Sequence, residues 1–228
     1  MPAKNSRKQY YENGYYHIYN RGVEKRKIFL DQQDYAVFLS YLKEYLLPKD
    51  ERALSKRLMD SSITSIEKNK ILKLLRLNNF SNEITLLAYC LMPNHFHFFV
   101  KQKSAGSIDK FMNSLGTRYT MYFNKKYDRV GSLYQGVYKA VSVNNESQFI
   151  YLSKYIHSQA LALQGEALQE QPSSYKDYLK QRKTEWVHPE EVLSYFSKTN
   201  PKFSYKSFVK EYPDEKEELV MNEIVIED

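Results

Sequence analysis

The sequence has 228 residues, and its 34 Lys and Arg outnumber its 27 Asp and Glu, which makes the formal net charge +7. This length fits one domain with additions, and a hydrophobic content of 42% excludes disorder over most of the chain. The single cysteine, Cys90, cannot close an intramolecular disulfide. The longest uncharged apolar run, Leu86 to Met92, is far below the roughly 20 residues that cross a bilayer, and the first dozen residues lack the apolar core of a signal peptide. We therefore expect a cytoplasmic protein that does not enter membranes.

The first part of the chain predicts a strand, a helix and a helical insertion. Residues 15–20 (YYHIYN) are aromatic and β-branched and run into the turn signal Asn20-Arg21-Gly22, as a strand does. Apolar residues at steps of three and four predict an amphipathic helix from Asp34 to Pro48, which ends it. Residues 49–82 are charged and polar with Leu and Ile at helical spacings, and we interpret them as a helical insertion.

Strands and helices alternate over the rest of the chain. Residues 84–92 (ITLLAYCLM) and 95–101 (HFHFFVK) predict two strands joined through Pro93-Asn94, and a β-hairpin is the simplest geometry. A second helix is expected over 107–124, a strand over 137–143, and a third helix over 146–163, with Asn144 or Asn145 as its cap. Two short helical patterns near 192–196 and 205–209 predict a smaller appendage. The pattern indicates an α/β domain with an insertion and a helical C-terminal extension.

Residues 93–97 (PNHFH) are the most informative in the sequence. Side chains alternate between the two faces of a strand, so His95 and His97 project to one side and Phe96 and Phe98 to the other. The two imidazoles then lie about 7 Å apart, which one divalent ion can bridge, and neutral imidazole is the commonest metal ligand. Two histidines alone form an incomplete metal site, and polar residues on an exposed strand face are the other interpretation.

The third helix offers groups that complete such a site. Its apolar residues form one stripe that must face the sheet: Phe149, Leu152, Ile156, Ala160 and Leu163. Tyr155 and Gln159 lie on the flank of this stripe, four residues apart, and so point the same way one turn apart. A phenol and an amide oxygen can thus be presented together to the histidines. With 21 tyrosines in the chain, packing is the ordinary interpretation for any one of them.

Four segments, taken in order, resemble the IS200-like single-tyrosine transposases, and the REP-associated tyrosine transposases most closely. They are YYHIYNRG (15–22), MPNHFHFFV (92–100), RYTMYFNKKYDRVGSLYQGVYKA (118–140) and YLSKYIHSQAL (151–161). The resemblance covers about residues 10–165, and residues 173–210 resemble the C-terminal extension common in that branch. It implies a ferredoxin-like core, an antiparallel sheet with helices on one face that carry the tyrosine over the histidine strand. The implied divisions are a catalytic domain (1–168), a small helical extension (169–210) and an acidic tail (211–228).

The resemblance also implies an HUH nuclease, a class named for two histidines around a bulky hydrophobic residue. His95 and His97 match the metal-binding pair, Tyr155 matches the nucleophilic tyrosine, and Gln159 matches the polar third ligand one turn later. Many relatives have Asn-Pro where this chain has Gln-Ala, and a glutamine still offers an amide oxygen. His157 is turned about 200° around the helix from Tyr155, and we interpret it as non-catalytic.

The reaction implied by the resemblance is a transesterification on DNA. Tyr155 attacks a phosphate of single-stranded or hairpin DNA, a 5′-phosphotyrosine forms, and a 3′-hydroxyl is released. Tyrosine ionises near pH 10 in water, so the phenol needs help from a divalent ion that polarises the phosphate. Phosphate and amide oxygens favour hard ions, and we expect Mg²⁺ or Mn²⁺ and no nucleotide cofactor. The protein would act as a monomer or a homodimer.

The predicted DNA contacts are basic and aromatic residues of the matching segments. Contacts to the DNA backbone are predicted for Arg21, Arg118, Lys125, Lys126, Arg129 and Lys139, and stacking on unpaired bases for Tyr134 and Tyr138. The tail over 211–228 holds eight acidic residues and one basic residue, so the body of the chain is strongly basic. For this tail we expect a solvated, disordered end. The alternatives are a shield over the basic surface and a mimic that competes with DNA.

The sequence also allows functions of other classes. A catalytically silent, domesticated protein that binds DNA hairpins for regulation would bind without metal and form no covalent adduct. A metal-dependent phosphodiesterase that uses water would remain active after Tyr155→Phe. An RNA-binding protein would prefer 2′-hydroxyls, but the sequence contains no recognisable RNA-binding motif.

Overall fold

The computed structural model describes residues 8–162, 171–211 and 215–224. Its strands are β1 (Tyr15–Arg21), β2 (Ile84–Met92), β3 (His95–Gln102) and β4 (Lys139–Val143). The helices of the body and insertion are α1 (Gln32–Leu46), α2 (Glu51–Leu58), α3 (Ser65–Arg76), α4 (Ser107–Lys126) and α5 (Glu146–Ala162). The C-terminal helices are α6 (Tyr175–Tyr178), α7 (Glu190–Leu193), α8 (Tyr205–Lys210) and α9 (Glu215–Ile224), and short 3₁₀ turns span Val23–Lys25 and Pro201–Phe203.

The four strands form one antiparallel sheet in the order β2-β3-β1-β4. The hairpin predicted around Pro93-Asn94 joins β2 to β3, with Met92 opposite His95 at its closed end. β1 then inserts between β3 and β4, which is the strand order of a ferredoxin-like sheet. The predicted mixed α/β fold with an antiparallel sheet is confirmed.

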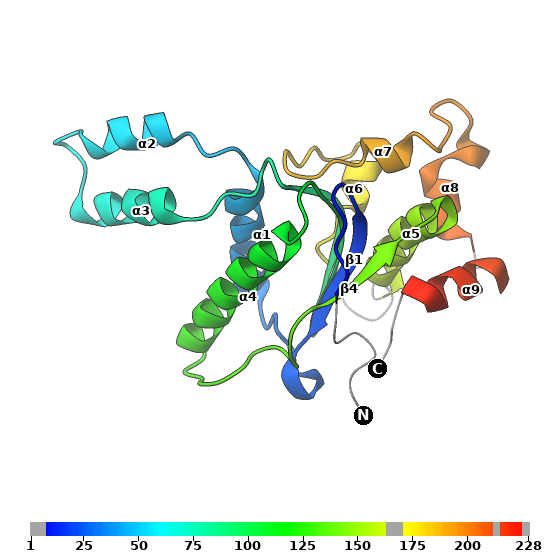
Figure 1. Ribbon diagram of the computed structural model, residues 1–228, viewed down its shortest axis with the longest axis horizontal. Helices are drawn as coiled ribbons and strands as arrows, with labels where there is room; N and C mark the ends of the chain where they lie inside the picture. Colours follow the sequence, from blue (N-terminus) through cyan, green and yellow to red (C-terminus); the bar gives the residue numbers. More distant parts are fainter. Residues whose placement is uncertain (1–7, 163–170, 212–214, 225–228) are drawn as a thin grey trace.

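Helices cover both faces of the sheet, as Figure 1 shows with the sheet close to edge-on. On one face, Phe96 and Phe98 of β3 pack against Phe38 of α1, in the core that α1 and α4 close. On the other face, α5 packs through its apolar stripe, in which Leu152 and Ile156 have no exposed surface. The expectation of helices on one face was wrong, because both faces of β2 and β3 carry apolar side chains and each needs a cover.

Local signals explain where the main helices begin and end. Asp31 caps α1 in a capping box with Asp34, and the helix stops at Leu46, just before Pro48. At α5, the Gln148 backbone N–H donates to Asn145 Oδ1 at 2.8 Å, so Asn145 is the cap. The strong patterns therefore placed these helices to within about two residues of their observed bounds.

The insertion forms an arm of two helices, α2 and α3, that projects from the body (Figure 1). No residue of α2 is buried, and Ile71 is the one buried residue of α3. Asp50 caps α2, and Thr64 forms a capping box with Glu67 at α3. Helix formation in the arm therefore depends on caps and local spacing, with little support from the core.

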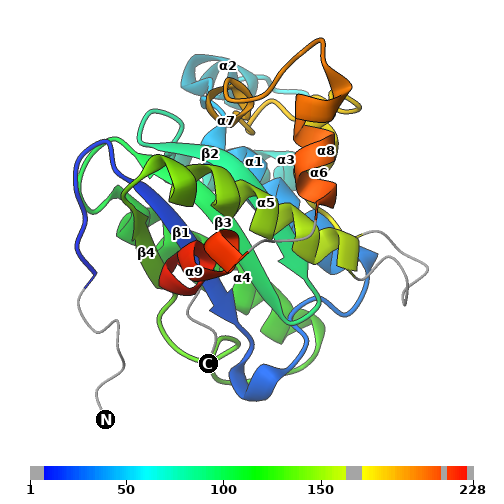
Figure 2. The ribbon, with the colours of Figure 1, turned by 90° about the vertical axis from the view of Figure 1, so that its right-hand side faces the viewer.

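The C-terminal extension closes the outer edge of β2. The Leu91 N–H donates to the carbonyl of Pro172 at 2.9 Å, and the Ser174 N–H donates to the carbonyl of Tyr89 at 3.0 Å. These bonds pair an edge that would otherwise be open to other chains. The segment that follows carries α6 to α8 across the α5 side of the molecule, next to α5 in Figure 2.

The acidic tail contains a helix that packs on α5. Lys154 Nζ of α5 lies 2.8 Å from Glu217 Oε2 of α9, and both side chains are buried. Gln148 Nε2 also donates to Glu223 Oε2 at 2.8 Å, and α9 lies alongside α5 in Figure 2. The expectation of a solvated, disordered tail was therefore wrong for residues 215–224. The rest of the predicted tail beyond residue 211 and the predicted boundary near 168 lie outside the described residues.

Among the helices of the described residues, none combines the length and the apolar character needed to cross a bilayer.

Candidate functional site

Strand β3 presents its two histidines to the face that α5 covers. The ring centroids of His95 and His97 are 4.9 Å apart, with planes inclined by 87°. His97 is 5% exposed, whereas His95, at the start of the strand, is only partly buried. Phe96 and Phe98 point into the opposite core, which anchors the strand and sets the direction of the histidines.

Both histidines are hydrogen-bonded through Nδ1. His95 Nδ1 lies 2.6 Å from Asn94 Oδ1, and His97 Nδ1 lies 2.9 Å from Nε2 of His17 on β1. Because an amide oxygen only accepts, His95 carries its proton on Nδ1 and keeps the lone pair on Nε2. Burial, with a smaller effect of the Arg21 cation, lowers the pKa of His95 to about 4, and burial also lowers the pKa of His97. Both rings are therefore neutral at pH 7, the form that binds metals.

Helix α5 brings Tyr155 to the histidines. Its ring meets His97 edge to face, with centroids 5.4 Å apart and planes at 88°, and its centroid lies 6.0 Å from that of His17. Tyr155 is partly exposed, whereas its neighbours Leu152 and Ile156 are buried against the sheet. The packing of the apolar stripe thus fixes the position of the phenol over the histidine strand.

The two histidines alone do not form a complete site for a hard divalent ion. Oxygen ligands from a side-chain amide or from a substrate would have to complete it. Within the described residues, no group of three or more His, Cys, Asp or Glu side chains is placed to hold a metal ion. The candidate protein donors are His95 and His97, together with Gln159, which is partly exposed one turn after Tyr155 on α5. Two imidazoles and an amide leave coordination positions for water or phosphate oxygens, so these residues fit Mg²⁺ or Mn²⁺.

The sequence motifs did not single out His17 and Tyr19, which lie beside the histidine pair. His17 has no exposed surface, and the Tyr19 ring lies nearly parallel to both neighbouring rings, with centroids 4.8 Å from His17 and 5.8 Å from His97. Alternation along β1 puts His17 and Tyr19 on one face. Only the pairing of β1 with β3, in which Tyr19 lies opposite His97, reveals that this face is the histidine face.

Two of the predicted DNA-contact residues lie on the same face as the histidines. Arg21 is opposite His95 in the β1–β3 ladder, and its Nε donates to Gln135 Oε1 at 3.3 Å. Lys139 is opposite Tyr19 in the β1–β4 ladder, and its Nζ lies 5.9 Å from the centroid of that ring. The sheet therefore places two cations next to the candidate site.

Four other predicted contacts lie on α4 or just after it, on the other side of the sheet. Arg118 pairs with Glu44 at 2.6 Å, and Lys126 Nζ lies 2.8 Å from an oxygen of Asp34, a fully buried side chain. Arg129 Nη1 donates to Asn124 Oδ1 at 3.0 Å, and Lys125 is exposed. The ion pairs of Arg118 and Lys126 join α4 to α1, so the structure gives these two residues a packing function and does not bring any of the four to the histidines.

The two predicted stacking residues are packed against other side chains. Tyr138 is 5% exposed, its hydroxyl is hydrogen-bonded to Asp109 and Tyr10, and Lys8 Nζ lies 3.3 Å from its ring centroid. The prediction that Tyr138 stacks on a base was therefore wrong, because the ring belongs to the core. Tyr134 packs edge to face on Phe96, on the α4 side of the sheet, with its hydroxyl buried.

His157 fastens α5 to the C-terminal extension. It has no exposed surface, its Nδ1 lies 2.6 Å from the Tyr205 hydroxyl, and its Nε2 lies 2.7 Å from Ser174 Oγ. Burial lowers its pKa to about 3, with a smaller effect of the Arg182 cation. The residue packs away from Tyr155, as its position around the helix predicted, and its burial leaves no surface for a DNA contact.

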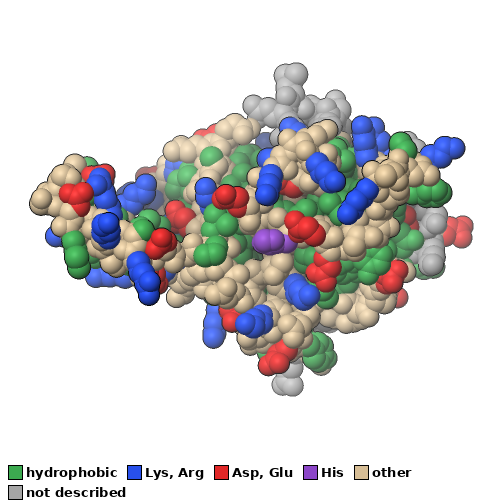
Figure 3. Space-filling model, turned by 90° about the horizontal axis from the view of Figure 1, so that it is seen from above, with side chains coloured by type: hydrophobic (Ala, Val, Ile, Leu, Met, Phe, Trp, Pro, Cys, Tyr) green, Lys and Arg blue, Asp and Glu red, His purple; other side chains and the backbone are tan. Residues whose placement is uncertain are grey.

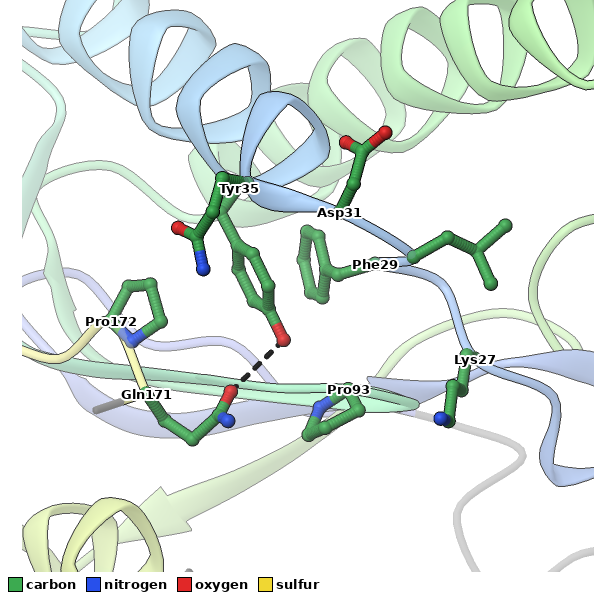
Figure 4. A pocket seen from close by; sticks show the side chains of 9 residues that line it. Lys27, Phe29, Asp31, Tyr35, Pro93, Gln171 and Pro172 are labelled. Atoms are coloured by element: carbon green, nitrogen blue, oxygen red, sulfur yellow. Dashed lines mark hydrogen bonds between the residues drawn. The ribbon is translucent and has the colours of Figure 1, made fainter. Parts of the chain in front are cut away.

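A separate pocket lies beyond the β2–β3 turn. Its wall includes Lys27, Phe29, Tyr35, Pro93 and Gln171, and Figure 4 shows the Tyr35 hydroxyl bound to Gln171 Oε1, at 2.9 Å. This bond ties the segment before Ser173 to α1. The histidines and Tyr155 do not line the pocket, so it is distinct from the candidate site.

Charges of both signs are mixed on the face seen in Figure 3. Lys and Arg side chains gather on the projecting α2–α3 arm, whereas acidic and basic side chains are interspersed over the body. The described residues on this face therefore form no continuous basic track for a phosphate backbone.

Comparison with known proteins shows which family part of this chain resembles. Residues 59–159 match the family model described as "Transposase IS200 like", and the matched segment contains His95, His97, Tyr155 and Gln159. This match confirms the predicted resemblance to IS200-like transposases over residues 59–159. No curated protein matches the chain.

Two solved structures are similar to the chain. One is a REP-associated tyrosine transposase bound to a REP hairpin, with a TM-score of 0.51 and 9% identity over 81% of this chain and 97% of that chain. The other is a candidate transposase from Deinococcus radiodurans R1, with a TM-score of 0.33 and 15% identity over 68% of this chain and 97% of that chain. At such low identity the first similarity shows a shared fold. The match of residues 59–159 to the family model and the shared fold together support a transposase role.

Proposed function

We propose that the chain is a metal-dependent single-strand DNA nuclease and strand transferase of the HUH type. The observation that carries this proposal is the contact of Tyr155 of α5 with His97 of the β3 histidine pair, whose ring centroids are 5.4 Å apart. A nucleophile and a metal-binding pair from two different elements meet at one partly exposed point. The match of residues 59–159 to IS200-like transposases supports the same reaction class.

The protein groups have separate roles in this proposal. His95 and His97, held neutral by burial, would bind Mg²⁺ or Mn²⁺ through Nε2, and Gln159 would add its amide oxygen. When bound, the ion would withdraw charge from the scissile phosphate and orient it. The side-chain amide oxygen of Asn94 accepts from His95 Nδ1 and fixes the tautomer of His95, so the lone pair stays on Nε2.

Tyr155 carries the covalent step. Its phenolic oxygen attacks the phosphorus, the bond from phosphorus to the 3′ oxygen breaks, and the phenolic proton is lost to solvent while the leaving oxygen gains one. The products are a 5′-phosphotyrosine and a free 3′-hydroxyl. The reverse attack by this hydroxyl, or by one on another strand, rejoins DNA without ATP, because the phosphotyrosine keeps the bond energy.

The proposed substrate is single-stranded or hairpin DNA. A tyrosine on a helix reaches one strand, and the similar REP-associated transposase structure holds a REP hairpin. Arg21 and Lys139, on the histidine face, are the proposed contacts to the DNA backbone. We also propose a cytoplasmic location, in keeping with the single buried thiol of Cys90.

The test is an adduct assay with the full chain. Labelled hairpins from the DNA that flanks its own gene are incubated with Mg²⁺, Mn²⁺ or EDTA, and covalent complexes are separated on a denaturing gel. We expect a metal-dependent band that is lost in Tyr155→Phe and in His95→Ala/His97→Ala. Tyr151→Phe is the matched control, since Tyr151 lies one turn earlier on α5 and packs on Phe208.

Three outcomes contradict the proposal. Binding of hairpins without any adduct favours the silent DNA-binding protein. Cleavage that persists in Tyr155→Phe favours a phosphodiesterase that uses water. If Tyr151→Phe loses the adduct band as completely as Tyr155→Phe does, the loss is not specific to the Tyr155 hydroxyl, and the role of Tyr155 as the nucleophile is contradicted.

A further inference from the structure

The proposed site leaves one buried histidine without a role. His17 of β1 has no exposed surface, and its Nε2 lies 2.9 Å from His97 Nδ1. Burial of two polar rings against each other is costly unless they are hydrogen-bonded. In this hydrogen bond, one of the two ring nitrogens must carry a proton and donate it, and the other must accept it.

The geometry of the pair is that of an in-plane hydrogen bond. The ring planes are inclined by only 18°, and the centroids are 5.1 Å apart. This separation is close to the sum of the 2.9 Å distance between the nitrogens and the two ring radii, so the line between the nitrogens runs within both ring planes. A proton on one nitrogen thus points at the lone pair of the other. Two ligands of a shared ion would instead aim their lone pairs at a third point.

Metal binding through His97 Nε2 decides the direction of this bond. A neutral imidazole that offers the Nε2 lone pair carries its proton on Nδ1, and this proton must be donated to His17 Nε2. We infer that His17 is a positioning residue that holds His97 in the Nδ1-protonated, metal-binding tautomer. The inference rests on the proposed function, because it names a support for the same site.

The ring of Tyr19 packs against the rings of both His17 and His97. Its ring is inclined by 28° to His17 and by 27° to His97, with centroids 4.8 Å and 5.8 Å away. A ring in this position limits rotation of both imidazoles and keeps water from competing for the bond. His17, Tyr19 and His97 therefore form one packed unit, which the pairing of β1 with β3 assembles.

The first test measures the His97 tautomer without metal or DNA. Two-bond proton–nitrogen NMR spectra of the full chain distinguish a protonated from an unprotonated ring nitrogen. We expect His97 to be protonated on Nδ1 in the wild-type protein and to become a mixture of tautomers in His17→Phe. Protonation of His97 on Nε2 in the wild-type protein would overturn the inference, and this readout needs no variant to fold.

The second test measures Mn²⁺ binding to the full chain by electron paramagnetic resonance at pH 7. His17→Phe keeps a ring but no acceptor, and we expect its Mn²⁺ affinity to fall about 10- to 100-fold. His17→Gln returns an acceptor near the position of Nε2 and should recover most of this loss. Equal loss in both variants would overturn the inference, since Mn²⁺ affinity would then not depend on an acceptor at this position. Greater loss in His17→Gln than in His17→Phe would also overturn it, because it would show that the ring only fills space.

The wild-type titration separates the two proposals. The proposed function is contradicted if the wild-type protein does not bind Mn²⁺, or if His95→Ala/His97→Ala binds Mn²⁺ as tightly as the wild-type protein does. Normal binding in wild type together with unchanged binding in His17→Phe contradicts only the role of His17.

Discussion

Gln159 is the residue at which the chemistry of the proposed metal site can be varied most directly. It is partly exposed on α5, one turn after Tyr155, and its amide oxygen is a weaker ligand for a hard ion than a carboxylate is. We expect Gln159→Leu to weaken Mn²⁺ binding by about tenfold or more and Gln159→Glu to strengthen it. Mn²⁺ titrations of the two variants at pH 7 check this, and equal affinities would remove Gln159 from the site.

At the same scale, His157 predicts a pH dependence of stability. Burial holds its pKa at about 3 in the folded protein, whereas a histidine in an unfolded chain has a pKa near 6.5. Between these values the unfolded state binds more protons, so the free energy of unfolding falls as the pH is lowered from about 6.5 towards 3. Above pH 6.5 this contribution is fully present.

Denaturant titrations between pH 7 and pH 4 measure this effect. His157→Gln keeps a polar side chain that does not titrate, and its stability should fall less steeply, by up to about 1.4 kcal/mol per pH unit. Parallel slopes for the variant and the wild-type protein would show that His157 does not contribute.

At the scale of elements, α5 combines three contacts. Its apolar stripe packs on the sheet, its flank presents Tyr155 and Gln159, and Lys154 binds Glu217 of α9. One helix thus connects the candidate site with the C-terminal segment. Apolar periodicity predicts the first contact well, but the ion pair joins two residues 63 positions apart and leaves no periodic trace.

The ion pair between Lys154 and Glu217 should hold α9 on α5. Lys154→Met leaves the Glu217 carboxylate buried without its cation, which we expect to lower the free energy of opening of α9 by about 3 kcal/mol. Hydrogen exchange of the amides of residues 215–224 measures this opening. Lys154→Met/Glu217→Leu removes both charges and should restore much of the protection. Unchanged exchange in the single variant would show that the pair does not hold the helix.

At the scale of the whole molecule, the body and the arm differ in what stabilises them. The body has a core on each face of the sheet, whereas the α2–α3 arm buries only Ile71. Replacing residues 51–76 with a short Gly-Ser loop should therefore change the free energy of unfolding by no more than about 1 kcal/mol, or Tm by about 4 °C. Thermal unfolding checks this, and a fall of Tm above about 10 °C would show that the arm supports the core.

The sequence by itself determined the parts that depend on local order. Period-two and period-three-to-four patterns predicted the strands and main helices, and alternation put His95 and His97 on one face. The stripe on α5 predicted which flank carries Tyr155. The segments that resemble IS200-like transposases predicted the family whose model matches residues 59–159.

Only the tertiary structure decided which distant residues meet. The pairing of β1 with β3 places His17 and Tyr19 beside His97. Arg118 and Lys126 of α4 form ion pairs with α1, on the side of the sheet opposite the histidines. Glu217 of α9 forms an ion pair with Lys154 of α5. Such contacts depend on register and on the cover that each apolar face requires. A local pattern shows that a side chain needs a partner but does not show which partner the fold supplies, because the free energy of the contact comes from burial between segments far apart in the chain.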